Sequence, residues 1–262
     1  MLNHTRAEMK AAAKSALEGK WGTAIGALLL SQVVPAVVLC IAICLMVFMA
    51  YLCIGYGAVG SGIIIWILVY IFEFAFIFLI LGPLTITYRF FNLRLGRGLE
   101  VNATMPYQCF QGVQYRRVAL SYFMYTLFIF LWSLIFVVPA LLVILLPEPW
   151  SFVLYILCFP LLIPMYVKML SYDMMFFVML DHPETNWQSA LNESKQMMHG
   201  HKTDLFVLYL SFIPWLLLVG VTAGLAGLYV YPYMYTTVAN FYRSLKEENV
   251  AAAGEIPNEF IA

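Results

Sequence analysis

The segment VPAVVLCIAICLMVFMAYLC, residues 34–53, contains twenty residues and no charged side chain. An α-helix of about 20 apolar residues crosses the hydrocarbon core of a bilayer. The segment belongs to an apolar run that begins at residue 22, and the glycine-rich stretch Tyr56–Gly62 follows it. A second apolar run then covers residues 63–92. This pattern predicts a transmembrane hairpin, in which a short outer turn joins two membrane-spanning helices.

The rest of the chain shows the same pattern twice more. Four further apolar runs cover residues 118–146, 150–180, 204–221 and 226–243. The composition is 63% hydrophobic and only 11% charged, whereas a soluble domain has roughly 25% charged residues. We therefore expect an all-α polytopic membrane protein, a single domain over residues 1–262 with six transmembrane helices in three hairpins. Several runs are longer than one span needs, and Pro35 and Pro83 are among the expected kink points.

Positive charges lie on one side of the predicted membrane. All 14 Lys and Arg residues fall into four groups that the hairpins place at one face: residues 6–20, 89–117, 168–202 and 243–246. The outer turns contain neither Lys nor Arg: residues 54–62, 147–150 and 220–227. Because inward-facing loops retain positive charge, both termini are expected in the cytoplasm. The formal net charge of zero favours no nucleic-acid partner.

The segments also align as three copies of one unit, covering approximately residues 5–97, 98–181 and 182–246. Each copy begins with a short amphipathic helix, continues through a basic knot and ends with an apolar hairpin. The predicted amphipathic helices are Thr5–Gly19, residues 102–115 and residues 185–199, and the knots are Lys20, Arg116-Arg117 and His201-Lys202. Residues 247–262 then form a flexible cytoplasmic tail.

The amphipathic helices have local sequence signals of their own. Thr5 and Glu8 match a capping box, in which each side chain binds the other residue's backbone N–H. One face of the first helix is expected to hold Met9, Ala12, Ala13 and Ala16, with Arg6, Lys10 and Lys14 beside it. The third helix is expected to present Trp187, Ala190, Leu191, Met197 and Met198 and to end at Gly200. Such helices lie flat in the headgroup layer, where they brace the bundle or, alternatively, sense anionic lipid.

Three separated stretches resemble a known bacterial family. They are GKWGTAIG at 19–26, SKQMMHGHK at 194–202 with LYLSFIPW at 208–215, and PYMYTTVANFYR at 232–243. The family is catalogued as domain of unknown function nine-seven-five, and the similarity covers roughly residues 5–245. It implies a six-span protein of the bacterial cytoplasmic membrane and carries over no catalytic residue. Asp173 departs from the family, which has a small residue at this position.

Glu73 is the candidate residue for transport or ion coupling. It lies near the middle of the second predicted span, where an ionisable side chain is costly and usually faces the bundle interior as part of a functional site. The alternative is a structural role, as a neutral carboxyl that hydrogen-bonds a polar side chain of another span.

Basic residues at the inner ends of the spans are candidate contacts for lipid headgroups or other anions, because guanidinium groups bind phosphate in a bidentate manner. These candidates are Arg89, Arg94, Arg116, Arg117, Lys168 and Lys202. Asp173 lies near Lys168 in sequence and is expected to pair with a basic residue of a neighbouring repeat. The simpler interpretation of most of these cations is the positive-inside signal itself.

The sequence contains no motif of a hydrolase, a metalloprotease or a nucleotide-binding loop. His199-Gly-His201 has the wrong spacing for a helical metal site, so we expect no metal, no cofactor and no enzymatic activity. The expected function is a non-enzymatic membrane scaffold or lipid- and envelope-associated factor. Its partners are expected to be membrane lipids, together with a membrane protein or a second copy of the chain. The alternative is a transporter or flippase-like carrier of an amphipathic or anionic compound, with Glu73 as the coupling carboxylate.

Overall fold

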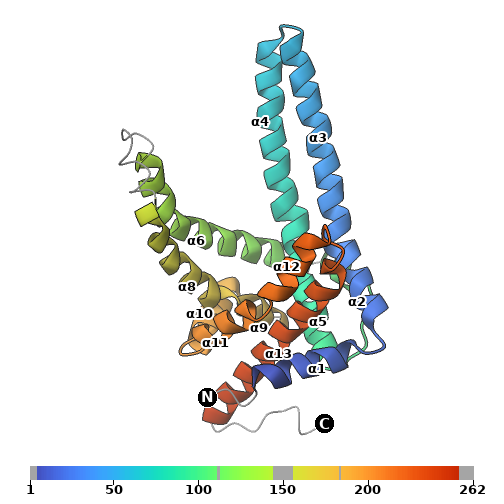
Figure 1. The fold of residues 1–262 in the computed structure, drawn as a ribbon, viewed down its shortest axis with the longest axis vertical. Coiled ribbons are helices and arrows are strands. Elements are labelled where there is room, and N and C mark those ends of the chain that lie inside the picture. The colour runs from blue at the N-terminus through green and yellow to red at the C-terminus, as the bar shows by residue number, and fades with distance from the viewer. Residues whose placement is uncertain (1–4, 111–112, 144–155, 183, 254–262) are drawn as a thin grey trace. The chain divides into compact units, whose positions relative to one another are not determined.

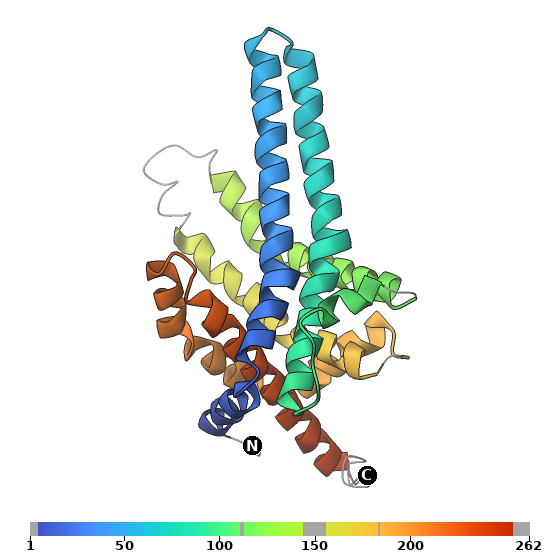
Figure 2. The ribbon, with the colours of Figure 1, turned by 90° about the vertical axis from the view of Figure 1, so that its right-hand side faces the viewer.

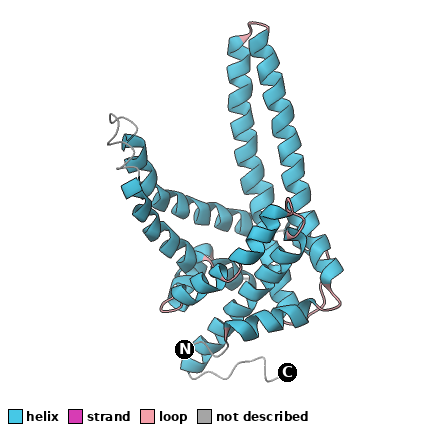
Figure 3. Ribbon diagram, viewed as in Figure 1, coloured by secondary structure: helices cyan, strands magenta, loops and turns pink. Residues whose placement is uncertain are grey.

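A computed structural model describes residues 5–110, 113–143, 156–182 and 184–253. The described part is built from helices, with short turns between them and no strand (Figure 3). Five helical stretches in it are long and apolar enough to cross a membrane: Trp21–Gly55, Gly60–Gly96, Tyr115–Leu141, Ile156–Asp181 and Lys202–Val221. The prediction of an all-α fold is therefore confirmed for the described residues, and these five helices are compatible with a membrane protein.

The chain divides into two compact units, each assembled from separate stretches of sequence. Unit 1 comprises Met1–Met9, Phe123–Pro214 and Phe241–Ala262, and unit 2 comprises Lys10–Tyr122 and Trp215–Asn240.

Unit 2 contains the hairpin predicted from the first two apolar runs. Its first arm consists of α2 (Trp21–Leu28), the π-helix η1 (Leu29–Val33) and α3 (Val34–Gly55). Its second arm consists of α4 (Val59–Phe76), the π-helix η2 (Ile77–Leu81) and α5 (Gly82–Gly96). α3 and α4 lie side by side (Figures 1 and 2). Gly62 permits this close approach, because a Cβ atom there would collide with the Ile54 side chain.

The remaining elements of unit 2 surround the inner end of this hairpin. They are the C-terminal part of α1 (Arg6–Leu17), the 3₁₀-helix η3 (Met105–Phe110), the beginning of α6 (Val113–Val143), most of α12 (Ile213–Val221) and the first half of α13 (Gly227–Ala253). Within the hairpin, α5 is the most deeply buried part of the second arm, since its side chains Leu84, Ile86, Phe91, Leu93 and Leu95 are fully buried.

Unit 1 is built around a short buried helix. The unit contains the rest of α6, η4 (Phe159–Leu161), α8 (Leu162–Tyr172), α9 (Met175–Asp181), α10 (Trp187–Met197), α11 (Lys202–Leu210) and the end of α13. α9 is apolar on every side, and residues 175–179 are all buried. A helix that is apolar all round belongs in a core, so α9 forms the centre of this unit.

The sixth predicted span, residues 226–243, lies within α13 and differs from the other five. With 27 residues α13 is long enough, but it is not among the described helices that are apolar enough to cross a membrane. Its buried side includes the polar residues Thr236, Thr237 and Asn240. These side chains pack within the protein, and they lower the mean hydropathy of the helix. The layout of six spans in three hairpins stays a prediction, and the outer turn at 147–150 lies outside the described residues.

Helices α1 and α10 form where the first and third amphipathic helices were expected. Thr5 N–H donates to Glu8 Oε2 at 2.8 Å and Glu8 N–H donates to Thr5 Oγ1 at 3.3 Å, which confirms the capping box. The third helix is shorter than expected, because Asn186 caps it by accepting a hydrogen bond from Ser189 N–H. The buried face of α1 consists of Met9, Ala13 and Leu17, which follow one another at intervals of four residues. Ala12 is exposed, so the expectation that it lies on this face was wrong.

The prediction of an amphipathic α-helix over residues 102–115 was wrong. The structure has the 3₁₀-helix η3 over Met105–Phe110, and Arg116 and Arg117 lie inside α6 instead of preceding it. Pro106 accounts for the difference, because a proline cannot donate the backbone hydrogen bond that a longer helix would need here. The predicted flexible tail also differs, since α13 continues to Ala253 and residues 254–262 lie outside the described part.

Two junctions far apart in sequence have the same local structure. α1 is followed by Gly19 with φ 73° and α10 by Gly200 with φ 89°. The next residue, Lys20 (φ −117°, ψ 7°) or His201 (φ −106°, ψ 5°), precedes the following helix. Buried residues occupy matching positions: Met9 and Ala190, Ala13 and Ser194, Leu17 and Met198, Ala24 and Leu205, Ala27 and Leu208, Ser31 and Phe212. The threefold repeat as a whole, with its boundaries near 97 and 181, stays a prediction.

Candidate functional site

Glu73 lies on the seam between the two arms of the hairpin. It shares a face of α4 with the buried residues Gly62 and Val69, which precede it by eleven and four positions. Its side chain is half-buried, and among the described residues its carboxyl group makes no hydrogen bond or ion pair. The expected polar partner from another span is therefore not present in this part of the structure.

The six candidate anion contacts separate into two sets. Arg89, Arg94, Arg116 and Arg117 belong to unit 2, and Lys168 and Lys202 belong to unit 1. The four arginines come from one continuous stretch, residues 89–117, which comprises the end of the second candidate span, the beginning of the third and the residues between them.

Aromatic rings hold two of these arginines at the end of α5. The Arg89 guanidinium lies 5.9 Å from the centroid of Tyr235, and the Arg94 guanidinium lies 6.0 Å from that of Phe90. The Nε atom of Arg94 is buried, although the residue as a whole is partly exposed. Lys20 extends to the same end of α5, where its Nζ donates to Leu99 O at 3.3 Å and to Gly98 O at 3.5 Å. A cation at the C-terminal end of a helix is favoured by the exposed carbonyl groups there.

A buried polar contact between α5 and α13 fixes this geometry. Asn92 is fully buried, donates from Nδ2 to Tyr88 O at 2.7 Å and accepts from Thr236 Oγ1 at 3.1 Å. One turn further along, Gly96 permits the approach of Asn240, because a Cβ at Gly96 would lie 2.8 Å from Asn240 Oδ1. Since the second contact follows the first by four residues on both helices, α5 and α13 run in the same direction. This packing places Tyr235 against α5 and hence beneath Arg89.

Lysines of the two amphipathic helices make matching contacts. Lys14 Nζ of α1 lies 5.7 Å from the centroid of Tyr233, and Lys195 Nζ of α10 lies 5.6 Å from that of Tyr172. Burial and the nearby Lys14 lower the pKa of Lys10 on the same face of α1. Burial, more than the neighbouring charge, thus opposes protonation of Lys10.

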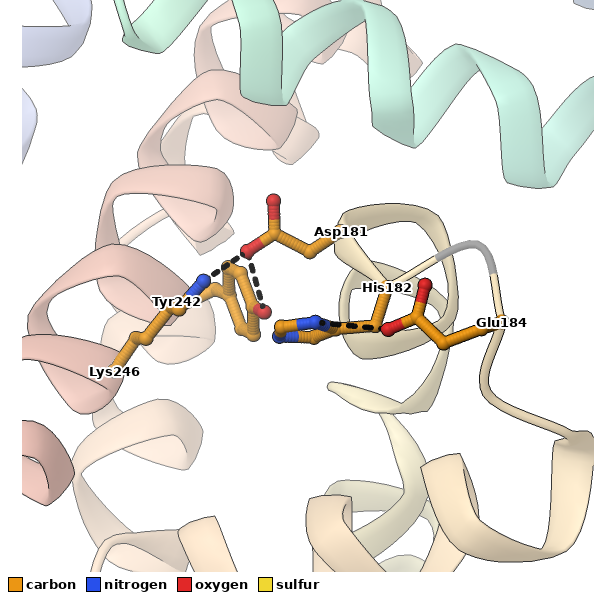
Figure 4. Close-up of polar contacts among 5 residues, drawn as sticks. All are labelled: Asp181, His182, Glu184, Tyr242 and Lys246. Atoms are coloured by element: carbon orange, nitrogen blue, oxygen red, sulfur yellow. Dashed lines mark hydrogen bonds and ion pairs between the residues drawn. The ribbon is translucent and has the colours of Figure 1, made fainter. Parts of the chain in front are cut away.

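Unit 1 contains a buried carboxylate with a basic partner. The side chain of Asp181 is only 8% exposed, and its Oδ2 accepts from Lys246 Nζ at 2.6 Å and from Tyr242 OH at 3.2 Å. Figure 4 shows these three side chains converging from α9 and α13, while His182 points toward Glu184 instead. The sequence analysis missed this cluster, since 65 residues separate Asp181 from Lys246.

The other predicted polar residues of unit 1 are placed separately. Asp173 is buried and accepts a hydrogen bond from Tyr209 OH at 2.7 Å, so a tyrosine of α11 takes part in binding it, where a basic residue was expected. Lys168 Nζ lies 4.8 Å from the centroid of Trp132. Lys202 is the first residue of α11. Within the described residues, no group of three His, Cys, Asp or Glu side chains could hold a metal ion.

The zero net charge of the chain conceals an imbalance between its units. Unit 2 contains eight Lys and Arg residues and three acidic residues, whereas unit 1 contains six and eleven. The cations of unit 2 are Lys10, Lys14, Lys20, Arg89, Arg94, Arg97, Arg116 and Arg117, and its acids are Glu18, Glu73 and Glu100. Unit 2 is thus strongly basic, and its basic residues lie in the stretches 10–20 and 89–117.

Long apolar helices with basic residues gathered at their ends define a polytopic α-helical membrane protein. Within this class, the profile of the family described as protein of unknown function (DUF975) matches residues 1–249. The chain belongs to this family, which confirms the resemblance found in its three motifs. Neither a search of curated proteins nor one of solved structures gave a match.

Proposed function

We propose that this protein is a non-enzymatic scaffold of the bacterial cytoplasmic membrane whose basic unit 2 binds the headgroups of anionic phospholipids. The proposal includes six spans and both termini in the cytoplasm, as the positive-inside pattern predicts. The observation that carries it is the excess of positive charge in unit 2, which is concentrated beside the inner ends of its spans.

The chemistry of the arginines fits a phosphate ligand. A guanidinium group offers a planar set of N–H donors that matches two phosphate oxygens. Arg94 is held by the Phe90 ring and keeps part of its surface accessible, while Arg116 is exposed on the first turns of α6. The anionic inner leaflet attracts each nearby Lys or Arg by about 1 kcal/mol, so this stretch is well suited to hold one or more headgroups.

Several observations favour a scaffold over the carrier with Glu73 as its coupling carboxylate. A carrier needs polar groups that face a path through the membrane. Several hydroxyl groups along the helices hydrogen-bond the carbonyl oxygens of their own helices: Ser31 to Ala27 O, Ser121 to Arg117 O and Thr237 to Tyr233 O. Glu73 itself faces the apolar seam of the hairpin. A partner protein or a second copy of the chain, which a scaffold would also bind, stays a prediction.

The test measures the binding of phosphatidylglycerol by native mass spectrometry of the purified protein, with two double variants. Arg94→Gln with Arg116→Gln removes two cations from unit 2, and Lys168→Gln with Lys202→Gln removes two from unit 1. We expect the unit 2 variant to bind the lipid roughly ten- to thirtyfold more weakly, with a smaller difference at high salt. The unit 1 variant should bind nearly as the unchanged protein does. Equal losses in both variants, or no loss in the unit 2 variant, would contradict the proposal.

A further inference from the structure

Both arms of the α3–α4 hairpin change their hydrogen-bonding register at its base, and a proline follows each change. η1 precedes Pro35 and η2 precedes Pro83, each by one intervening residue. In these segments the N–H groups of Val34 and Gly82 bond the carbonyl oxygens five residues earlier, at Leu29 and Ile77. Single-turn π segments within α-helices occur frequently at functional sites. Because the same break occurs at the same level of both arms, we treat the two breaks as one structural feature.

Each proline lacks a backbone N–H that could pair with a carbonyl group at the break, and a tyrosine hydroxyl donates to a carbonyl group there. A carbonyl pairs with the N–H four residues later in an α turn and five residues later in a π turn. Leu30 lies five residues before Pro35, and Leu79 lies four residues before Pro83. Tyr107 OH donates to Leu30 O and Tyr115 OH donates to Leu79 O, both at 2.7 Å.

Tyr107 belongs to η3, which packs against α5 of the second arm, and Tyr115 belongs to the first turn of α6. Thr87 Oγ1 of α5 donates to Pro106 O at 2.8 Å, next to Tyr107. Gln32 and Thr85 also connect the two arms at this level, with 3.2 Å between Gln32 Oε1 and Thr85 Oγ1.

Beyond the breaks, the hairpin is anchored mainly to itself. The extensive contacts of α3 and α4 are with each other and with the π segments. Residues along the outer faces of both arms are exposed, among them Leu45, Tyr51, Ile67 and Tyr70. Within the part of the chain that the structure describes, the two arms therefore form a paired rod, and η1 and η2 lie where this rod meets α2 and α5.

We propose that the paired π segments and prolines form a hinge at the base of the α3–α4 hairpin, and that the hydroxyls of Tyr107 and Tyr115 latch it. With both hydroxyls bonded, the two free carbonyls are satisfied and the hairpin keeps one tilt relative to α5 and η3. When a hydroxyl is removed, its carbonyl must find another donor in an apolar environment. The backbone then changes register at the break, and the hairpin tilts over a wider range.

The experiment measures the distance between spin labels at Tyr56→Cys, on the hairpin tip, and Glu100→Cys, after α5, in a cysteine-free chain reconstituted in nanodiscs. Tyr107→Phe and Tyr115→Phe are compared with Tyr51→Phe and Tyr70→Phe, two exposed tyrosines of the same hairpin. We expect a broader distance distribution for the first pair and an unchanged one for the second. Hydrogen exchange of the protein with its native cysteines should rise about fivefold at residues 29–35 and 77–83.

Replacing each proline separates the latch from a general loss of stability. Pro83→Ala restores a backbone N–H four residues after Leu79, so Tyr115→Phe should have no effect on the distances in that background. Pro35→Ala should likewise abolish the effect of Tyr107→Phe on the distance distribution and leave the effect of Tyr115→Phe unchanged. The proposal would be overturned by unchanged distances in both tyrosine variants or by hydrogen exchange that rises throughout unit 2. It would also be overturned if Pro83→Ala abolished the effect of Tyr107→Phe, or Pro35→Ala that of Tyr115→Phe.

Discussion

Replacing Gly82 by alanine should lower the thermal midpoint of the detergent-solubilised protein more than any other glycine substitution in the hairpin. A Cβ at this position would collide with the ring of Tyr122, whose Cγ lies 2.6 Å away and whose Cδ1 lies still closer. Gly82 is buried at the start of α5, next to Pro83, so the helix cannot shift easily. Forcing an additional atom into a packed interior costs typically 1–3 kcal/mol, and we expect the upper end of this range.

Gly60→Ala is the matched control, since Gly60 is also helical and nothing lies within 4 Å of its Cβ position. Alanine is the better helix former by up to about 1 kcal/mol, so this variant should be as stable as the unchanged protein or slightly more stable. Tyr122→Ala should restore much of the stability lost in Gly82→Ala by removing the obstructing ring. Equal thermal midpoints for Gly82→Ala and Gly60→Ala would show that Gly82 of α5 does not pack closely against Tyr122 of α6.

Lys246→Met should destabilise unit 1 considerably more than Asp181→Asn. Asp181 is 8% exposed and Lys246 is 35% exposed, so the loss of the lysine leaves a negative charge that water can scarcely reach. Removing one partner of a buried ion pair costs about 3–5 kcal/mol, and the partial exposure of Lys246 reduces this to about 2–4 kcal/mol. Asparagine at 181 still accepts a hydrogen bond, and the lysine can turn to water, so this change should cost only about 1 kcal/mol.

Thermal unfolding monitored by intrinsic fluorescence gives the midpoints for this comparison. Glu184→Gln serves as the control, because the His182–Glu184 pair has side chains that are 41% and 76% exposed and exposed ion pairs contribute little. If Asp181→Asn proved as damaging as Lys246→Met, or if both resembled Glu184→Gln, the buried ion pair between α9 and α13 would not stabilise this unit.

The sequence predicts best what depends on neighbouring residues. The run at residues 34–53 contains no charge, and its length alone indicates a span. The capping box of Thr5 and Glu8 needs only a spacing of three residues, and the structure confirms it. For the same reason, the end of α10 before Gly200 could be expected from a residue that tolerates positive φ.

Features that depend on distant parts of the chain were not predictable. The polar residues of α13 read as part of an ordinary span, but Thr236 meets Asn92, which lies 144 positions earlier. Residues 102–115 have an amphipathic pattern, yet Pro106 and the bonds of Tyr107 and Tyr115 to the hairpin determine their conformation. The prolines predict kinks, but the tyrosines that satisfy the resulting free carbonyls can be found only in the structure.

The candidate site was predictable as a set of residues and not as an arrangement. Sequence spacing predicts that the arginines of residues 89–117 lie near the ends of two successive spans. It could not show that the basic and acidic residues divide between two units, because each unit combines separate stretches of the chain. The position of Glu73 was likewise predictable along the helix axis, but its face of the helix, which meets α3, depends on packing.

The most direct test of the account is the orientation of unit 2, because its basic ends can bind anionic headgroups of the inner leaflet only from the cytoplasmic side. A membrane-impermeant maleimide is applied to bacteria that express a cysteine-free chain with either Gly60→Cys, near the hairpin tip, or Glu100→Cys, after α5. The account predicts labelling of Gly60→Cys in intact cells and of Glu100→Cys only after lysis. Labelling of Glu100→Cys in intact cells, with Gly60→Cys protected until lysis, would contradict it.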